Sequence, residues 1–368
     1  MSNSLAKFKI FLWDTYAKFY DWYEFPYSRG KQTKMSFIKK RINATPLSDA
    51  QKQEIISFWK PYYNIKKELH WFEFYNTYSE DKQQLKYYIP DSIYYTIIDV
   101  FYTNPPRSLQ MDDKNLYDLY FHDIRRPNTI LHKANGFLLD KDYQRITIEQ
   151  AVALCKSFKS VIYKKTIDSE AGRGVRFFDL DTIGDNEFIE WLKQKDNFII
   201  QEVLQQHPSL SKIYDKSINT VRIVSFMLDD GLHLLSSDFR MGRNGSRVDN
   251  LNSGGIVCGI DENGCLKEFA CDSAGNRYSQ HPQGITFRGY PIVGYSKCCD
   301  LVKELVGRVT GLSQLISWDF AIGTDGDPIL IEVNLTYGGV DHHQINNGPI
   351  FGELTEKVLK QVFHSSKS

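Results

Sequence analysis

The chain of 368 residues is poor in cysteine, carries no excess charge of either sign and contains no internal repeat or low-complexity segment. None of its six cysteines forms a CxxC pair, and Cys258, Cys265 and Cys271 have no histidine nearby at zinc-ligand spacing. This spacing argues against a zinc motif and indicates reduced core thiols. The chain contains 45 lysine and arginine residues and 45 aspartate and glutamate residues. This balance argues against bulk nucleic-acid binding and leaves only a local basic patch as an alternative.

Long apolar runs are also absent. No run approaches the roughly 18–20 residues that span a bilayer, and we expect no secretory signal ahead of the first helix. The sequence therefore predicts a cytoplasmic protein without a transmembrane segment. Residues 8–42 predict one or two helices rich in aromatic and basic side chains. Such a helix can make a peripheral membrane contact or cover a neighbouring domain, and both alternatives stay open, as does the oligomeric state.

Two common nucleotide-binding motifs are missing as well. The front of the chain holds no strand–GxGxxG–helix unit, and the sequence contains no GxxxxGK(S/T) loop. These absences exclude a dinucleotide fold at the front and a P-loop. Helical patterns fill the front instead, and one of them starts with a capping box in which Ser48 is the N-cap and Gln51 closes the box.

Beyond this helical front the pattern becomes α+β, with antiparallel strands that carry basic side chains. The strand at 160–165 contains Lys164 near its end and precedes a loop at 166–174 with glycines near its tip. Successive backbone N–H groups in such a loop can hold phosphate oxygens. Taken alone, Gly172 and Gly174 are explained equally well by a plain hairpin turn.

Two arginines lie on later strands. Arg222 interrupts an apolar strand at 217–226, and Arg240 ends the strand at 232–241. An arginine inside an apolar strand is rare unless it is paired or meets an anionic ligand. A single lysine is usually a solvated surface residue, so Lys114 is a candidate for ligand binding only as part of a basic set.

The hairpin at 318–334 carries the acidic counterpart of this set. Two apolar runs flank Asp325–Gly326, and an Asp-Gly pair in that setting predicts a two-residue turn. With the turn there, Asp319 faces Glu332 at about 4.5–5.5 Å between Cβ atoms, and such a carboxylate pair requires a cation or proton between its members. Asn334 projects from the same face as Glu332. This all-oxygen set suits Mg²⁺ better than it suits a solvated hairpin, because it interrupts otherwise apolar strands.

The basic and acidic sets together can neutralise a nucleoside triphosphate. Lysines and arginines would contact its phosphates, and Mg²⁺ would bridge them. In this order along the chain, the arrangement resembles the ATP-grasp superfamily and, over about residues 45–365, its sugar-transfer-associated family. The phrases that carry the resemblance are Tyr88–Asp91, Asp113–Asn115, Gln206–Pro208, Ser217–Arg222, Val248–Asn250, Gly254–Gly255, His281–Pro282, Trp318–Asp319 and Ile331–Asn334. As a set they are specific, although no single phrase is.

The resemblance implies a role for each matching residue. The ATP contacts it implies are Lys114, Lys164, Gly172, Arg173, Gly174, Gln201, Glu202, Val203, Leu204, His207 and Asn250. Within that set the lysines would hold phosphates, the glycine loop would close over them, and residues 201–204 would line adenine and ribose. Arg222, Arg240 and Lys164 would stabilise the reacting phosphate. Asp319, Glu332 and Asn334 would bind one or two Mg²⁺, with Mn²⁺ as an alternative.

One position departs from the family pattern. The family usually has a proline or small residue after the strand-end lysine, whereas Lys165 follows Lys164 here. Strand alternation places only one of the two on the ligand side, so which lysine faces phosphate stays open, and alignment favours Lys164.

The resemblance also implies a fold and a reaction. The expected fold is α+β, an ATP-grasp fold of two α+β lobes clasping ATP, preceded by a helical N-terminal region. The expected divisions are 1–108, 109–204 and 205–368. The expected enzyme is an ATP-dependent carboxylate–amine ligase that forms an amide through an acyl phosphate. The family name points to sugar or polysaccharide precursors in cell-surface or capsular polysaccharide biosynthesis, with small-molecule or glycan-linked acids and amines as substrates and no nucleic-acid partner.

Two other classes of function compete with this expectation. Asp179-Leu180-Asp181 is a DxD triplet, which in a glycosyltransferase can hold a metal–nucleotide sugar, but such triplets arise often by chance. A non-catalytic nucleotide-binding module is the second alternative. The complete set of basic and acidic residues argues against it.

Overall fold

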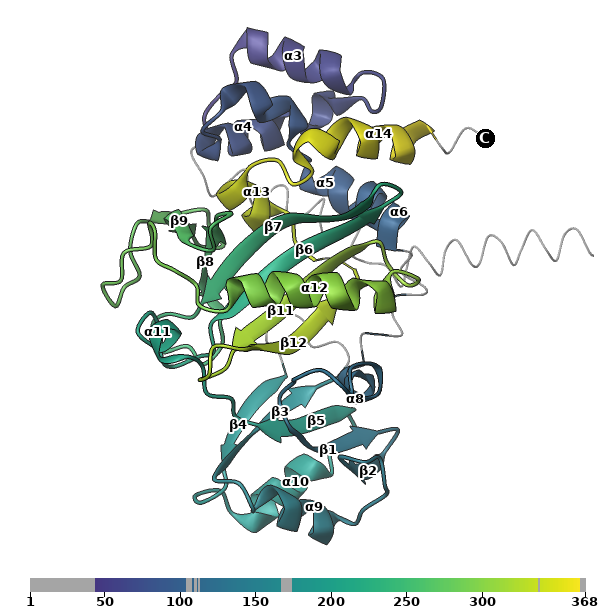
Figure 1. Ribbon diagram of the computed structural model, residues 1–368, viewed down its shortest axis with the longest axis vertical. Helices are drawn as coiled ribbons and strands as arrows, with labels where there is room; N and C mark the ends of the chain where they lie inside the picture. Colours follow the sequence, from purple (N-terminus) through teal and green to yellow (C-terminus); the bar gives the residue numbers. More distant parts are fainter. Residues whose placement is uncertain are drawn as a thin grey trace, which may run out of the picture. The chain divides into compact units, whose positions relative to one another are not determined.

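The computed structural model describes residues 44–103, 108, 111, 113–166, 174–336 and 338–364 (Figure 1). The helices predicted at 8–42, together with Gly172 and Arg173, lie outside the described residues. Contacts divide the described residues into two compact units, one formed by residues up to Phe101 and from Phe351 onward, the other by residues from Tyr102 to Ile350. Among the described residues, no helix is both long and apolar enough to cross a bilayer.

The first unit is helical, as the sequence predicts. Its elements are α3 (Asp49–Trp59), η1 (Ile65–Glu68), α4 (Leu69–Tyr78), η2 (Lys82–Tyr87), α5 (Asp91–Ile93), η3 (Tyr94–Ile98), η8 (Gly352–Leu354) and α14 (Thr355–His364), with α6 (Asp99–Thr103) at its boundary. Ser48 and Gln51 form the predicted capping box. Aromatic side chains fill the core: Trp59 and Trp71 are buried, and Tyr75 stacks on Tyr88 with ring centroids 4.7 Å apart.

The second unit contains two antiparallel sheets. The smaller one has the strand order β2-β1-β5-β3-β4. Its strands are β1 (Thr129–Ala134), β2 (Phe137–Asp140), β3 (Ser160–Lys165), β4 (Val175–Asp179) and β5 (Phe198–Glu202). Helices α9 (Ile148–Cys155) and α10 (Asp185–Leu192) pack on one face, where Cys155, Phe188 and Tyr163 join one apolar core. Because side chains alternate along β3, Lys164 projects from the opposite face.

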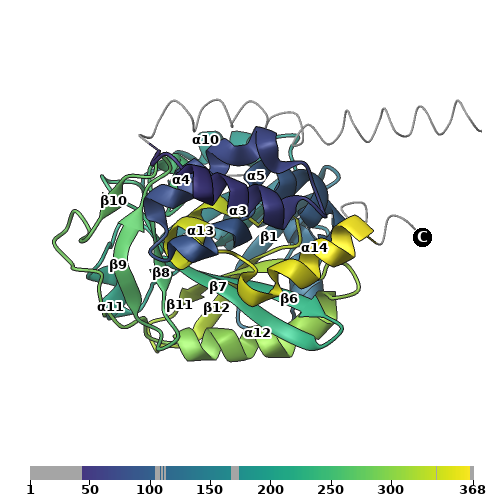
Figure 2. The same ribbon diagram turned by 90° about the horizontal axis from the view of Figure 1, so that it is seen from above.

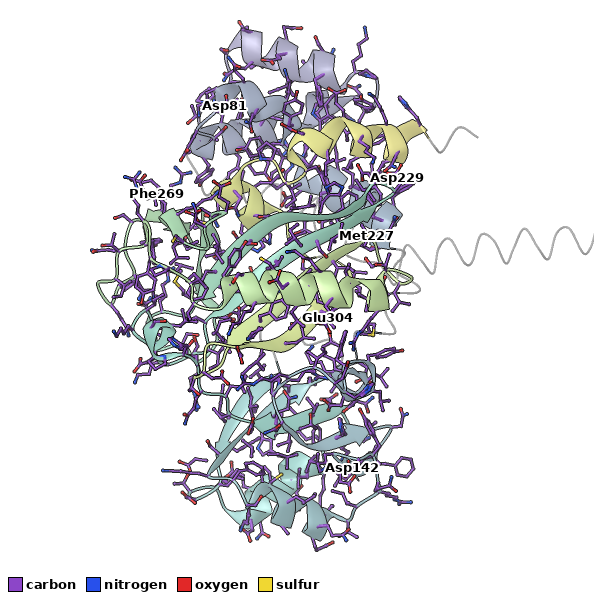
Figure 3. All side chains as sticks on the ribbon, in the orientation of Figure 1. Asp81, Asp142, Met227, Asp229, Phe269 and Glu304 are labelled. Carbon is purple, nitrogen blue, oxygen red and sulfur yellow. The ribbon has the colours of Figure 1, made fainter. Side chains whose placement is uncertain are left out.

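The larger sheet has seven strands in the order β10-β9-β8-β7-β6-β11-β12. They are β6 (Thr220–Leu228), β7 (Gly231–Met241), β8 (Ile256–Ile260), β9 (Leu266–Cys271), β10 (Arg277–Tyr278), β11 (Leu315–Ile322) and β12 (Pro328–Asn334). Helix α12 (Tyr295–Val309) covers one face and α13 (Asp341–Asn347) lies on the other (Figure 2). Val302 and Leu305 of α12 pack in the core with Trp318 and Phe320, whereas Glu304 of the same helix is exposed (Figure 3).

Short elements lie outside the two sheets. These are η5 (Lys114–Leu116), α8 (Tyr117–Tyr120), α11 (Pro208–Ser211) and η7 (Leu251–Ser253).

All six cysteines are free thiols, in agreement with the prediction, and Cys258 and Cys271 are buried whereas Cys265 is partly exposed.

The hairpin of β11 and β12 differs from the predicted two-residue turn. Gly326 N–H bonds to Gly323 O, and Gly326 alone of the tip residues has a positive φ, +84°, so the loop has three residues. An extra residue, Ile331, then bulges from β12, because Phe320 pairs with Leu330 but the preceding Asp319 pairs with Glu332. The predicted turn is wrong, yet the predicted Asp319–Glu332 pairing is confirmed, since the bulge restores the offset that the longer loop removes.

Candidate active site

Asp319 lies at the centre of a row of charges on the face of the large sheet that α13 covers. It pairs in register with Glu332 on one side and with Arg222 on the other. Arg222 holds it in a bidentate ion pair, with Nε 2.7 Å from Oδ1 and Nη2 2.6 Å from Oδ2. Arg240 also donates from Nη1 to Asp319 Oδ2 at 3.2 Å. Arg222 is therefore paired, which is the condition under which an apolar strand tolerates an arginine.

Both facing carboxylates are ionised. Burial raises the pKa of Asp319, but the guanidinium groups of Arg222 and Arg240 outweigh it and hold the pKa below its ordinary value. Burial and Asp319 raise the pKa of Glu332, and Lys114, whose Nζ lies 2.8 Å from Glu332 Oε1, brings the net shift below the ordinary value. The site thus keeps two adjacent anions charged because cations surround them.

The acidic residues fit a hard divalent ion. Asn334 faces Ser317 across the hairpin, donates from Nδ2 to Ser317 O at 3.4 Å, and a hydrogen bond from it also lowers the pKa of Asp319. An ionised carboxylate offers about four lone-pair sites, and the arginines use three of those on Asp319. To bind a metal, Asp319 would therefore give up the hydrogen bond from Asn334. Asp319, Glu332 and Asn334 are therefore an oxygen set of the kind Mg²⁺ prefers.

Tyr117 brings Lys114 to Glu332. Its hydroxyl donates to Val333 O at 3.0 Å and accepts from Val333 N at 3.3 Å, which ties the turn of η5 and α8 to the edge strand β12. Asp113 caps η5 through the N–H of Asn115 at 3.0 Å. The Asp-Lys-Asn phrase therefore forms a fixed turn that directs its lysine toward the acidic pair.

Lys164 and Lys165 have different surroundings. Lys164 Nζ donates to Gln201 Oε1 at 3.1 Å, and burial together with the charge of Lys114 lowers the pKa of Lys164 to about 8. Lys165 pairs with Asp196 at 2.9 Å instead. Gly174, with φ of +84°, packs so closely on the Lys165 stem that an added Cβ would lie 2.9 Å from it. Lys164 shares an electrostatic environment with Lys114 and Glu332.

Asp249 joins the charge row although sequence reasoning did not select it. Arg240 Nη2 lies 3.1 Å from Asp249 Oδ2, and Thr220 Oγ1 donates to the same oxygen. This aspartate stands directly before Asn250, inside a phrase that carries the family resemblance. The sequence signal for Asp249 was its position next to Asn250, which was predicted to contact the nucleotide.

Two predicted nucleotide contacts have local structural roles. The His207 ring accepts from Ser209 N at 3.2 Å as the N-cap of α11, and Asn250 Oδ1 accepts from Asn252 N at 2.8 Å as the cap of η7. Neither has a hydrogen bond to the charge row among the described residues.

Gln201 and Glu202 end β5, and Val203 and Leu204 follow it. Gln201 is buried, and Glu202, Val203 and Leu204 are partly buried. Glu202 Oε1 accepts from Asn128 N at 3.4 Å.

The DxD triplet forms a local turn. Asp179 and Asp181 are exposed, and Asp179 Oδ1 accepts the N–H of Asp181 at 3.1 Å. An aspartate that bonds its own backbone two residues on is a common turn device, and this arrangement gives the triplet a structural explanation.

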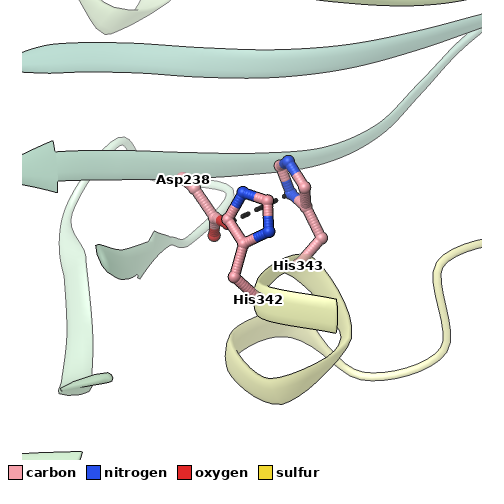
Figure 4. A group of neighbouring side chains, drawn as sticks. All are labelled: Asp238, His342 and His343. Carbon is pink, nitrogen blue, oxygen red and sulfur yellow. Dashed lines mark ion pairs between the residues drawn. The ribbon is translucent and has the colours of Figure 1, made fainter. Parts of the chain in front are cut away.

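A second polar cluster lies beside the charge row and was missed from the sequence. Asp238 of β7 pairs in register with Arg222, and α13 brings His342 and His343 to it (Figure 4). Burial raises the pKa of Asp238 to about 6, and burial lowers the pKa of His343 well below its ordinary value. Only the contact between a strand and a helix more than a hundred residues apart reveals this cluster.

Comparison with known proteins gives one family match. A family model described as sugar-transfer associated ATP-grasp matches residues 101–360. No curated protein matches the sequence.

Several solved structures are similar at low identity. D-alanyl-alanine synthetase A from Vibrio cholerae O1 biovar eltor has 12% identity and a TM-score of 0.41, over 71% of this chain and 67% of that chain. ATP-grasp ligase PsnB, complexed with minimal precursor, Mg and ADP, has 15% identity and a TM-score of 0.41, over 71% and 62%. L-amino acid ligase from Bacillus licheniformis has 14% identity and a TM-score of 0.38, over 71% and 50%. The chain thus spans between half and about two thirds of the length of these structures, and only the family match bears on its identity.

Proposed function

Because the chain belongs to the sugar-transfer associated ATP-grasp family, we propose that it is an ATP-dependent ligase that joins a carboxylate to an amine. The observation that carries the proposal is the charge row, in which Asp319 and Glu332 stay ionised among Lys114, Arg222 and Arg240. Such a row matches a substrate that brings its own negative charge together with a divalent ion.

ATP and Mg²⁺ would divide the row between them. Asp319, Glu332 and Asn334 would hold one or two Mg²⁺, which neutralise charge on the phosphates when bound. Lys114 and Lys164 would contact phosphate oxygens. The placement of Lys164 next to Gln201, and of Lys165 next to Asp196, supports Lys164 as the phosphate ligand.

The remaining nucleotide contacts are proposed from family resemblance. Residues 201–204 would line the adenine and ribose, and Gly172, Arg173 and Gly174 would close over the phosphates. His207 and Asn250 would act through the elements that they cap, since their side chains are engaged there.

The reaction would have two steps. In the first, a carboxylate oxygen of the acid substrate attacks the γ-phosphorus of ATP, and the bond between this phosphorus and the β-phosphate oxygen breaks. ADP departs, and the acid becomes an acyl phosphate. In the second, the amine attacks the acyl carbon, phosphate leaves with the bonding electrons, and the nitrogen loses a proton. Neither step needs a protein nucleophile. Arg222 and Arg240 would stabilise the charge that develops on the transferred phosphate.

The substrates are proposed from the family description. An association with sugar transfer favours a uronic acid or an amino sugar, free or linked to a glycan, as one partner, within cell-surface or capsular polysaccharide synthesis. We place the reaction in the cytoplasm because it consumes ATP.

A screen for ADP release tests the proposal. The full chain with Mg²⁺ and ATP would be incubated with paired acid and amine libraries that include uronic acids and amino sugars. We expect ADP release that requires both an acid and an amine. Glu332→Gln should reduce the rate of ADP release by at least about 100-fold, because it removes a ligand of the Mg²⁺ that would neutralise the reacting phosphates.

Glu268→Gln provides the matched control. Glu268 is also paired with an arginine, Arg288, at 2.5 Å, but it lies on the surface. It should leave ADP release unchanged. Normal turnover by Glu332→Gln would overturn the metal assignment, and nucleotide binding without ADP release for any pair would favour a non-catalytic nucleotide-binding module.

A further inference from the structure

The cluster of Asp238, His342 and His343 has the chemistry of a transition-metal site. Each residue offers one ligand atom, and these atoms all lie within 4.8 Å of one another. Asp238 Oδ2 lies 3.2 Å from His343 Nδ1 and 4.0 Å from His342 Nε2. Ligand atoms held about 2.0–2.2 Å from one tetrahedral zinc ion would lie roughly 3.4 Å apart. The Asp238–His343 spacing is close to this value, and His342 would have to move closer to Asp238.

The cluster leaves polar atoms without partners in a closed environment. Asp238 and His343 are fully buried, with 0% exposure, and His342 is 7% exposed. Among the described residues, Asp238 Oδ2 and His343 Nε2 have no hydrogen-bond partner. The 3.2 Å contact between Asp238 and His343 is thus close but lacks hydrogen-bond geometry. A buried carboxylate oxygen without a donor is costly, and a cation between it and the imidazoles would remove that cost.

Surrounding residues orient two of the three side chains, Asp238 and His342, as outer partners orient metal ligands. Asn347 Nδ2 donates to Asp238 Oδ1 at 2.8 Å and leaves Oδ2 directed at the histidines. Asp341 Oδ1 lies 3.3 Å from His342 Nδ1, so a hydrogen bond there leaves the lone pair of Nε2 for a ligand. A carboxylate on the outer nitrogen of a histidine is the usual support of a metal-binding imidazole.

One contact would have to change on metal binding. Ser236 Oγ lies 2.7 Å from His343 Nδ1, the nitrogen that faces Asp238. This hydroxyl also accepts from Asn347 Nδ2 at 2.9 Å. A bound ion would displace the serine from the nitrogen, while the bond from Asn347 could keep its oxygen in place.

We propose that Asp238, His342 and His343 form a binding site for a divalent transition ion, with Zn²⁺ as the best match, separate from the Mg²⁺ set. Two imidazoles and one carboxylate favour Zn²⁺ over Mg²⁺, because magnesium takes oxygen ligands. The ion ties α13 to β7 directly beside Arg222, the residue that holds Asp319. The site does not depend on the proposed ligase activity.

Zinc binding to the full chain tests this site. Metal-free protein would be titrated with Zn²⁺ against a competing chelator in a large excess of Mg²⁺, which fills the oxygen set. We expect one Zn²⁺ per chain. Asp341→Asn should weaken binding by about 10–100-fold, the range for loss of an outer partner, and Asp238→Asn and His342→Ala should weaken it further.

Two controls separate this site from others. His233→Ala removes an exposed histidine of the same strand, whose Nε2 lies 3.0 Å from Asp230, and should leave Zn²⁺ binding unchanged. Glu332→Gln should also leave it unchanged. Equal Zn²⁺ affinity in wild type, Asp238→Asn and His342→Ala, or loss of binding in His233→Ala or Glu332→Gln, would overturn the proposal.

A measurement on the wild-type protein alone covers the case in which the buried variants fail to fold. X-ray absorption at the zinc edge, in excess Mg²⁺, should show two imidazole ligands and one carboxylate. A spectrum with oxygen ligands only, or no Zn²⁺ retained at all, would contradict the site.

Discussion

At the scale of single residues, the site consists of charges that stabilise one another before any ligand arrives. The sequence identified Arg222 as an arginine in need of a partner and Asp319 as a carboxylate in need of a cation. It did not predict that they are partners of each other, because this depends on the register of β6 against β11, which no local pattern encodes. Asp238 was missed for a similar reason, because its place beside Arg222 depends on the register of β7 against β6.

Breaking the Arg222–Asp319 pair should destabilise the protein. Removing one partner of a buried ion pair costs about 3–5 kcal/mol, and Arg240 should keep Arg222→Met near the lower end. In a double-mutant cycle with Asp319→Asn, measured by urea denaturation, we expect a coupling energy of at least about 1 kcal/mol. The exposed pair Arg288–Glu268 should give less than about 1 kcal/mol in the same cycle. Additive effects at Arg222 and Asp319 would contradict this prediction.

Lys164 should make ATP binding depend on pH. With its pKa lowered to about 8, Lys164 is half protonated at pH 8 before ATP binds. Bound phosphate raises the pKa of a nearby lysine, so binding takes up protons and affinity falls as pH rises above about 8. Calorimetry at pH 8 in buffers of different ionisation enthalpy should show this uptake in wild type and Lys165→Met, and much less in Lys164→Met. Equal uptake in all three proteins would rule out the role of Lys164.

At the scale of elements, the sequence predicted the features that depend on residues close together in the chain, such as helix caps and strand bounds. The predicted capping box at Ser48 is present, and Thr147 caps α9 in the same way. The predicted strand at 160–165 has the bounds of β3. Helix α13 was not predicted, because Asp341–Asn347 is short, polar and rich in histidine, and it gains its stability from contacts with strands far away in the sequence.

The edge of β12 depends on Tyr117. Tyr117→Phe should leave both Val333 backbone groups unpaired and cost about 1–3 kcal/mol of the free energy of unfolding. It should also raise KM for ATP more than it lowers kcat, since Lys114 loses its fixed turn. Among the described residues, the hydroxyl of buried Tyr163 has no hydrogen-bond partner, so Tyr163→Phe should be neutral or slightly stabilising. Equal effects of the two substitutions in urea denaturation would refute the anchoring role.

At the scale of the whole molecule, the family and the α+β ATP-grasp fold predicted from the sequence are confirmed. The order of the family motifs along the chain was enough to predict the family and the fold, because these motifs follow one another in a fixed order. The candidate site was harder to predict. Its basic residues come from η5 and β3 on one side and from β6 and β7 on the other, so only the folded chain shows that His207 and Asn250 serve as caps whereas Lys114 contacts Glu332.

Because the site draws on both sheets of the second unit, nucleotide binding should protect both. Hydrogen exchange measured by mass spectrometry with and without a non-hydrolysable ATP analogue and Mg²⁺ should show slower exchange at 113–116 and 160–165 as well as at 328–334. Segment 176–183, which carries the DxD turn, should change little. Protection confined to one sheet would contradict a nucleotide held between them.

The bulge at Ile331 has a consequence for any alignment or redesign of this hairpin. A regular strand shows every second side chain to one face, but the extra residue lets β12 present Ile331 and Glu332 there in succession. An alignment that treats this strand as regular would assign its positions to the wrong faces on one side of residue 331. A gap at that position corrects the assignment, and a designer who removes the residue loses an apolar side chain beside the carboxylate while keeping the Asp319–Glu332 pair.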